Sequence, residues 1–247
     1  MQAEALDSYS ANRTKLLNIL TIVTVITMVI TIVSALFVAE TDAQQGNVQR
    51  IFYMHIGAFT GGATAFFITV IAGVAYLRTR NPKWDRLALA SVEMGLPLMI
   101  INLVTGIVWS RPTWNTWWAG DDPRVNSMAV MCLLYGAYLT LRGAIDSPDR
   151  RMRFAAVYGI LAFISVIYVF FVIRFNSQTL HPVVLGPSPV ESNAKGSFGV
   201  KDPRMIFTMS ISSISWMLTA FTLIWYRLRM ENTAERIRML KLRVLSQ

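Results

Sequence analysis

The amino-acid sequence predicts an all-α integral membrane protein, a single bundle of six transmembrane helices. Of its 247 residues, 54% are hydrophobic and only 15% are charged, and the mean hydropathy is +0.45. Roughly a quarter of the residues in a soluble domain are charged, so this chain is too apolar for that class. Its hydrophobic residues also gather in blocks near the ~20 residues that a helix needs to cross a bilayer. Alternating segments of about ten residues, typical of transmembrane β-strands, are absent from the sequence.

The six blocks are expected to be helical, because backbone polar groups in lipid must be hydrogen-bonded within their own segment. The first block has 24 residues and lacks a convincing cleavage site. A signal-peptide core has only about 7–15 residues, so a retained helix is favoured. The fourth block, with 17 residues, is the shortest. The predicted spans are residues 16–39, 51–77, 87–109, 125–141, 154–173 and 205–226.

Lysines and arginines outside the blocks predict the orientation. On the side of the two termini there are 16, and on the other side 7. Cytoplasmic loops carry the excess of positive charge, so both termini are expected in the cytoplasm. The outer face then has a connection over 40–50, a tryptophan-rich loop over 110–124 and a long loop over 174–204 with several prolines and glycines. The basic segment 227–247 is expected to extend the last helix on the cytoplasmic side.

Charge and cysteine content narrow the function classes. A net charge of +9 allows nucleic-acid binding, but the basic residues lie in short tracts between apolar blocks, which indicates loops that set topology beside anionic lipid. The single cysteine, Cys132, lies inside an apolar block and is expected to pack there. Phosphate-binding glycine loops, Ser/His/Asp triads and zinc-ligand spacings are absent from the sequence, so we expect no enzyme.

The only two histidines, His55 and His181, are predicted at the same outer face. His55 is the fifth residue of a span that begins there, and His181 follows the fifth span by eight residues. Two neutral imidazoles at one depth can supply both axial ligands of a haem iron. Each histidine taken alone is more readily interpreted as a packed or interfacial residue, but their agreement in depth makes a pair of ligands a competing interpretation.

Four of the seven tryptophans, Trp109, Trp114, Trp117 and Trp118, lie within ten residues of one outer loop. An aromatic belt at the membrane interface accounts for one or two of them. The spacing of the last three puts them on one helical face. A flat apolar platform, suited to a porphyrin, is the alternative interpretation.

Charged residues near these positions have two interpretations each. Arg50, Arg111 and Arg124 lie at outer helix ends, where guanidinium groups can pair with haem propionates or anchor the chain at lipid headgroups. Glu93 is ionisable within the third span. It can be a protonated hydrogen-bonding group, the partner of an arginine, or part of a polar access route.

Three stretches carry a family resemblance. Residues 103–124 read LVTGIVWSRPTWNTWWAGDDPR, residues 44–59 read QQGNVQRIFYMHIGAF, and residues 176–182 read NSQTLHP. In this order they resemble the CcmC-like family of haem-handling, tryptophan-rich cytochrome c maturation proteins. The family pattern Trp-Trp-x-Trp-Asp-Pro-Arg is not fully kept. If Asp122 begins the Asp-Pro-Arg match, then Asp121 stands where a tryptophan is expected and Gly120 precedes it.

The resemblance implies haem b, held non-covalently and transiently at the outer face of a bacterial cytoplasmic membrane. His55 and His181 would be the axial ligands, with Asp122 and the tryptophan-rich loop completing the site. The implied partners are a CcmE-like haem chaperone, CcmA-like and CcmB-like transporter subunits and a CcmD-like small protein.

The resemblance, together with the two histidines and the tryptophan-rich loop, therefore implies a protein that presents haem for delivery to a chaperone during c-type cytochrome biogenesis. One alternative is a component that transports haem across the bilayer. A second is a b-type cytochrome subunit, although such proteins often hold two haems with four histidines. A third is a scaffold that binds no cofactor.

Overall fold

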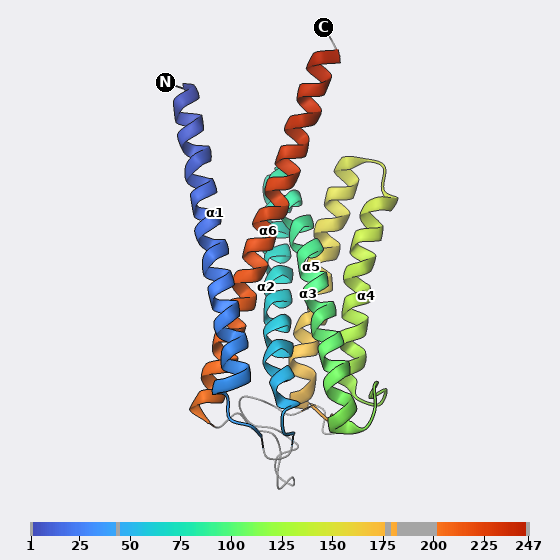
Figure 1. Ribbon diagram of the computed structural model, residues 1–247. Coiled ribbons are helices and arrows are strands. Elements are labelled where there is room, and N and C mark those ends of the chain that lie inside the picture. The colour runs from blue at the N-terminus through green and yellow to red at the C-terminus, as the bar shows by residue number, and fades with distance from the viewer. Residues whose placement is uncertain (1, 43–44, 176–178, 182–201, 246–247) are drawn as a thin grey trace.

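The computed structural model describes residues 2–42, 45–175, 179–181 and 202–245 (Figure 1). Within these ranges six helices are long and apolar enough to cross a membrane. This finding confirms the predicted all-α class and the number of spans. The helices are α1 Gln2–Val33, continued by the π-helix η1 Ser34–Val38, then α2 Gln49–Thr79, α3 Pro82–Trp114, α4 Pro123–Ala144, α5 Pro148–Phe175 and α6 Pro203–Leu245.

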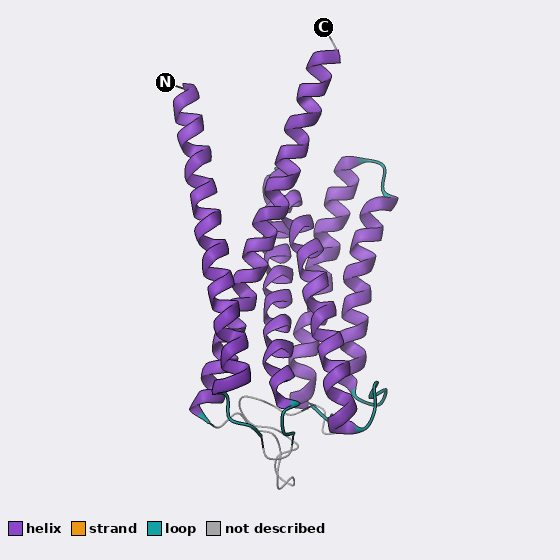
Figure 2. Ribbon diagram, viewed as in Figure 1, coloured by secondary structure: helices purple, strands orange, loops and turns teal. Residues whose placement is uncertain are grey.

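The two ends of the described chain lie at the same end of the bundle (Figure 1). The described residues of the connections, 39–42, 45–48 and 115–122, lie at the opposite end, which we call the loop end (Figure 2). The side that faces the cytoplasm stays a prediction from the charge distribution. Most of the predicted loop over 174–204 lies outside the described residues. Most of the basic segment 227–247 continues α6, which extends beyond the bundle to Leu245.

The helices are longer than the apolar blocks, because capping residues rather than hydropathy set their ends. Four of them begin at a proline, whose missing N–H has no intrahelical partner in the first turn anyway. Asn115, with φ 55°, ends α3 in the left-handed conformation. The prediction that Trp114, Trp117 and Trp118 share one helical face is therefore wrong: Trp114 is the last residue of α3, and the other two lie in the non-helical connection.

Helix α2 is the centre of the bundle and packs against α3, α5 and α6. Glycine allows α6 to approach closely: a Cβ on Gly61 would lie 2.6 Å from the backbone oxygen of Trp216. Helix α1 lies at the periphery against α6. Hydroxyl groups join these two helices, with Thr24 Oγ1 and Thr222 Oγ1 2.9 Å apart.

Two ion pairs tie the helices together near the end that holds the termini. Arg142 of α4 donates both terminal guanidinium nitrogens to the carboxylate of Asp85 in α3, at 2.5 and 2.8 Å. The Nε of Arg227 in α6 lies 2.7 Å from Oε2 of Glu93 in α3. Of the three interpretations of Glu93, the structure supports the arginine partner.

Candidate functional site

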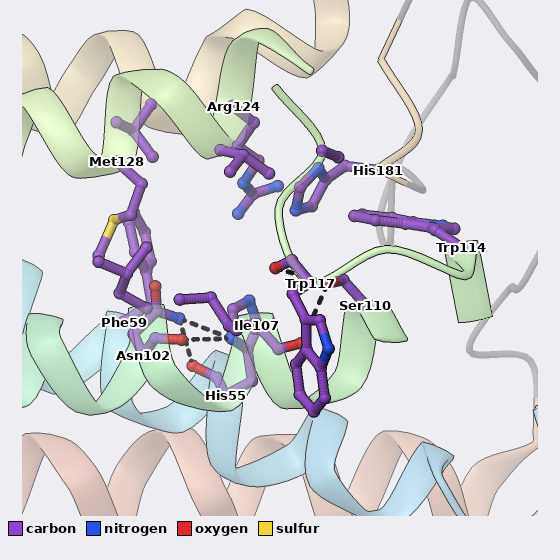
Figure 3. Close-up of a pocket in the computed structure, with 15 residues that line it drawn as sticks. His55, Phe59, Asn102, Ile107, Ser110, Trp114, Trp117, Arg124, Met128 and His181 are labelled. Carbon is purple, nitrogen blue, oxygen red and sulfur yellow. Dashed lines mark hydrogen bonds between the residues drawn. The ribbon is translucent and has the colours of Figure 1, made fainter. Parts of the chain in front are cut away.

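A cavity at the loop end is lined by residues from four helices, from the 115–122 connection and from the 179–181 segment (Figure 3). It holds about 460 Å³ of space free of protein atoms, part of it open to the exterior. Its walls include His55, Phe59, Asn102, Leu103, Gly106, Ile107, Ser110, Trp114, Trp117, Ala119, Arg124, Val125, Met128, Val169 and His181. A second compartment shares His55, Gly106, Arg124 and His181 with the first and adds Phe52, Ile56 and Trp109. The two predicted histidines therefore lie in one site.

His181 is held by the carboxylate of Asp122. Its Nδ1 lies 3.0 Å from Asp122 Oδ1. The second carboxylate oxygen accepts hydrogen bonds from the hydroxyl of Thr179 at 2.9 Å and from the backbone N–H of Leu180 at 2.6 Å. Asp122 also caps α4, because Oδ1 accepts from the backbone N–H of Arg124 at 2.9 Å. One side chain thus fastens the 179–181 segment to the beginning of α4.

The protonation states of this pair follow from burial and hydrogen bonding. Burial alone would raise the pKa of Asp122, but hydrogen bonds from His181, Leu180 and Thr179 hold that pKa well below its usual range. Burial and the neighbouring Arg124 lower the pKa of His181, although Asp122 opposes this shift. Near neutral pH the pair is therefore a carboxylate and a neutral imidazole. Nδ1–H of His181 donates to Asp122, which leaves the Nε2 lone pair free.

His55 enters the site from α2 and contacts α3. Its Nδ1 lies 2.9 Å from the backbone oxygen of Asn102. Figure 3 shows the His55 and His181 rings on different sides of the cavity, with Arg124 close to His181. The site therefore presents two imidazoles that come from a rigid helix and from a short loop segment.

The tryptophans divide into those that support the site and those that lie outside it. Trp114 packs edge-on against the His181 ring, with centroids 4.9 Å apart, and Trp109 packs in the same way on Trp114. Trp117 lines the cavity although 59% of its surface is exposed. Trp118 is 41% exposed and does not belong to the cavity wall.

Of the three predicted arginines, only Arg124 lines the cavity. Its guanidinium carbon lies 5.9 Å from the centre of the Phe59 ring. Arg50 instead donates to the backbone oxygens of Ala35 and Leu36 in η1. Arg111 donates to the backbone and side-chain oxygens of Asn115, both at 2.8 Å. These hydrogen bonds hold the side chains of Arg50 and Arg111 at helix ends and away from the cavity wall.

Several wall residues were not among the sequence predictions. Asn102 and Gly106 of α3 lie directly at His55, and Phe59 lies one turn beyond it in α2. The sequence could have indicated Asn102, because an amide side chain in a transmembrane span costs free energy unless it has a specific hydrogen-bonding partner. Nothing in the sequence indicated Gly106, because glycine is common in membrane helices.

The fold and the site together define a polytopic helical membrane protein with a tryptophan-flanked, two-histidine cavity at one end. The chain matches the sequence model of the family described as "CcmC: Heme exporter protein C" over residues 3–243, and it belongs to this family.

Individual relatives agree with this assignment. Heme exporter protein C of Escherichia coli strain K12 is 30% identical over 199 residues, covering 77% of this chain and 73% of that protein. The protein of the same name from Bradyrhizobium diazoefficiens is 28% identical over 205 residues, covering 83% and 74%. The relative from Paracoccus denitrificans is 26% identical over 145 residues, and the match spans only 60% of its length.

Proposed function

We propose that this protein binds haem b as a transient cargo at its loop end, with His55 and His181 as the two axial ligands. It then presents the haem to a haem chaperone during the maturation of c-type cytochromes. The observation that carries this proposal is the convergence of both histidines, from segments far apart in the sequence, on one cavity. The names of the relatives support the choice of cargo, because they are haem exporter proteins.

The chemistry of the wall also suits haem. Among the described residues, no group of three or more His, Cys, Asp or Glu side chains could hold a bare metal ion. Two imidazoles suffice for an iron that brings four porphyrin nitrogens. Phe59, Met128 and Val169 give the cavity an apolar wall, as a porphyrin requires. Arg124, the cationic side chain among the described residues of the cavity wall, would pair with a propionate.

The orientation and partners complete the proposal. The loop end would face outward from the cytoplasmic membrane of a bacterium, an orientation that the charge distribution supports. A CcmE-like chaperone would receive the haem there, and CcmA-like, CcmB-like and CcmD-like proteins would assist. A ccmC-like relative from Marchantia polymorpha, 26% identical over 150 residues, is named for cytochrome c biosynthesis, which supports the same pathway.

The test is an absorption spectrum of the detergent-purified chain after haem is supplied. The wild type should give the low-spin spectrum of bis-histidine haem. His55→Ala and His181→Ala should each lose it, because one axial ligand is gone. Leu133→Ala is the matched control, since this side chain is 74% exposed on α4 and lies outside the cavity. A wild type without a bis-histidine spectrum, or variants that retain it, would refute the proposal.

A second candidate function is haem transport across the bilayer by this chain itself, which the family description favours. It differs from the first in one measurable outcome. Haem should accumulate in sealed proteoliposomes that contain only this chain if transport occurs, and should stay bound at one face if the chain only presents haem.

A further inference from the structure

One face of α3 surrounds the His55 imidazole. Thr105 and Gly106 follow Asn102 by three and four residues, so all three lie on the same side of the helix. We infer that this face is a positioning device that fixes the tautomer and the tilt of His55 before iron binds. The inference rests on the proposed function, because it concerns how one of the two ligands is held.

The hydrogen bonds indicate which ring nitrogen carries the proton. Nδ1 of His55 lies 2.9 Å from the backbone oxygen of Asn102, which can only accept. Thr105 Oγ1 lies 3.3 Å from the same nitrogen, and its hydroxyl has backbone oxygens of α3 within 2.7 Å and 2.9 Å to donate to. Two acceptors therefore face Nδ1, which favours a proton on it. The Nε2 lone pair is then left for a metal.

The Asn102 side chain also binds the backbone of His55 in α2. Its amide nitrogen donates to the backbone oxygen of His55 at 2.7 Å, and this side chain is almost fully buried, with 4% of the residue exposed. The amide nitrogen also lies 3.2 Å from Nδ1, farther than the backbone oxygen does. Asn102 thus ties α3 to α2 at the ligand itself, through both its main chain and its side chain.

Gly106 sets the tilt of the ring by having no side chain. A Cβ at this position would lie 2.9 Å from Cε1 of His55 and 3.3 Å from Nδ1. The first distance is closer than carbon atoms approach without displacement, so a methyl group must push the ring aside. Gly106 also lines both compartments of the site, so the space that it leaves open continues into the space available to a ligand.

The two histidines are consequently held by different means. His181 is oriented by a charged group, Asp122, on a loop segment. His55 is oriented by neutral groups of a membrane helix, which hold it without placing a charge at that depth. We therefore assign Asn102 and Gly106 as positioning residues that act through His55.

The test compares glycine-to-alanine changes at two membrane positions in the full chain, purified in detergent with haem supplied. Gly106→Ala should weaken haem affinity by ~10–100-fold, the range for residues that orient a metal ligand, and should reduce the low-spin fraction of the ferric spectrum. Gly136→Ala, in α4, should leave both unchanged, because no atom lies within 4 Å of its added Cβ. Alanine is the better helix former, so poorer helix formation cannot account for a loss.

Two further variants separate positioning from general damage. In a His55→Ala background, Gly106→Ala should have no additional effect on haem affinity, because its action passes through the missing ring. Asn102→Leu, which has the same number and branching of side-chain heavy atoms but no hydrogen-bonding groups, should lower the low-spin fraction in the His55-containing protein. It also serves as the second variant should Gly106→Ala fold poorly.

The outcomes are distinguishable. If the wild type has no bis-histidine spectrum, the proposed function fails and this inference fails with it. If the wild type has that spectrum and both Gly106→Ala and Asn102→Leu retain it at wild-type affinity, only the positioning role is refuted. A further loss caused by Gly106→Ala in the His55→Ala background would also refute it, because the residue would then act on haem directly or on the fold.

Discussion

Asp122→Ala is expected to abolish ligation by His181 as completely as the removal of His181 itself. The carboxylate is fully buried and accepts hydrogen bonds from the imidazole, from Thr179 and from the backbone of Leu180. Without it, nothing described in the structure fixes Nδ1–H of His181, and the 179–181 segment loses its attachment to α4. The variant should bind haem ~10–100-fold more weakly and lose the bis-histidine spectrum. It should also lose about 1 kcal/mol of stability from the α4 cap.

The measurement is a haem titration followed at the Soret band, with the unfolding temperature recorded in parallel. Thr179→Val is the matched control, because it removes the hydroxyl that donates to Asp122 Oδ2 and accepts from the backbone N–H of His181, but leaves Oδ1 to hold the imidazole. It should cost roughly 1.5–3 kcal/mol of stability, the range for a hydrogen bond to a charged group, and should keep the bis-histidine spectrum. Asp122→Asn should fall between the two. An amide oxygen can still cap α4 or accept from His181, but the amide nitrogen cannot accept from Thr179 and Leu180. Wild-type haem binding by Asp122→Ala would show that His181 needs no carboxylate to hold it.

Hydropathy and charge were sufficient to predict the six spans and to place both histidines at one end. Each of these features depends on one variable, the depth in the bilayer, which the order of apolar blocks determines. Helix ends could not be predicted in the same way. The residues 110–114 are polar enough to end an apolar block, yet α3 continues through them to its left-handed residue Asn115.

The direction of side chains was the second feature that the sequence could not predict. Arg50, Arg111 and Arg124 are equivalent by depth, but only Arg124 begins a helix whose first turn faces the histidines. The other two donate to backbone oxygens at helix ends. These acceptors are set by the folded structure and could not be identified from the sequence. At the departure from the family pattern, Asp121 is exposed, whereas the buried Asp122 caps α4 and holds His181.

Among the single substitutions proposed, Arg142→Ala is expected to lower the free energy of unfolding the most. Its partner Asp85 has only 9% of its side chain exposed and Arg142 has 11%, so the remaining carboxylate would be left nearly buried without a counter-charge. Removing one member of such a pair costs about 3–5 kcal/mol. At roughly 2–4 °C per kcal/mol for a chain of this size, the unfolding temperature in detergent should fall by roughly 6–20 °C.

Two comparisons show whether burial of charge is the cause. Replacing both partners together, as Asp85→Leu with Arg142→Leu, should cost much less than Arg142→Ala alone, because no unpaired charge remains. Arg227→Ala should also cost less, because Glu93 and Arg227 are each 27% exposed, so this pair is less completely buried than Asp85 and Arg142. Equal losses in Arg142→Ala and in the double variant would mean that packing, not charge, holds α3 to α4 here. Asp85 lies 21 residues before Gly106 in the same helix, about 30 Å away, so the folded fraction of Arg142→Ala should keep the bis-histidine spectrum.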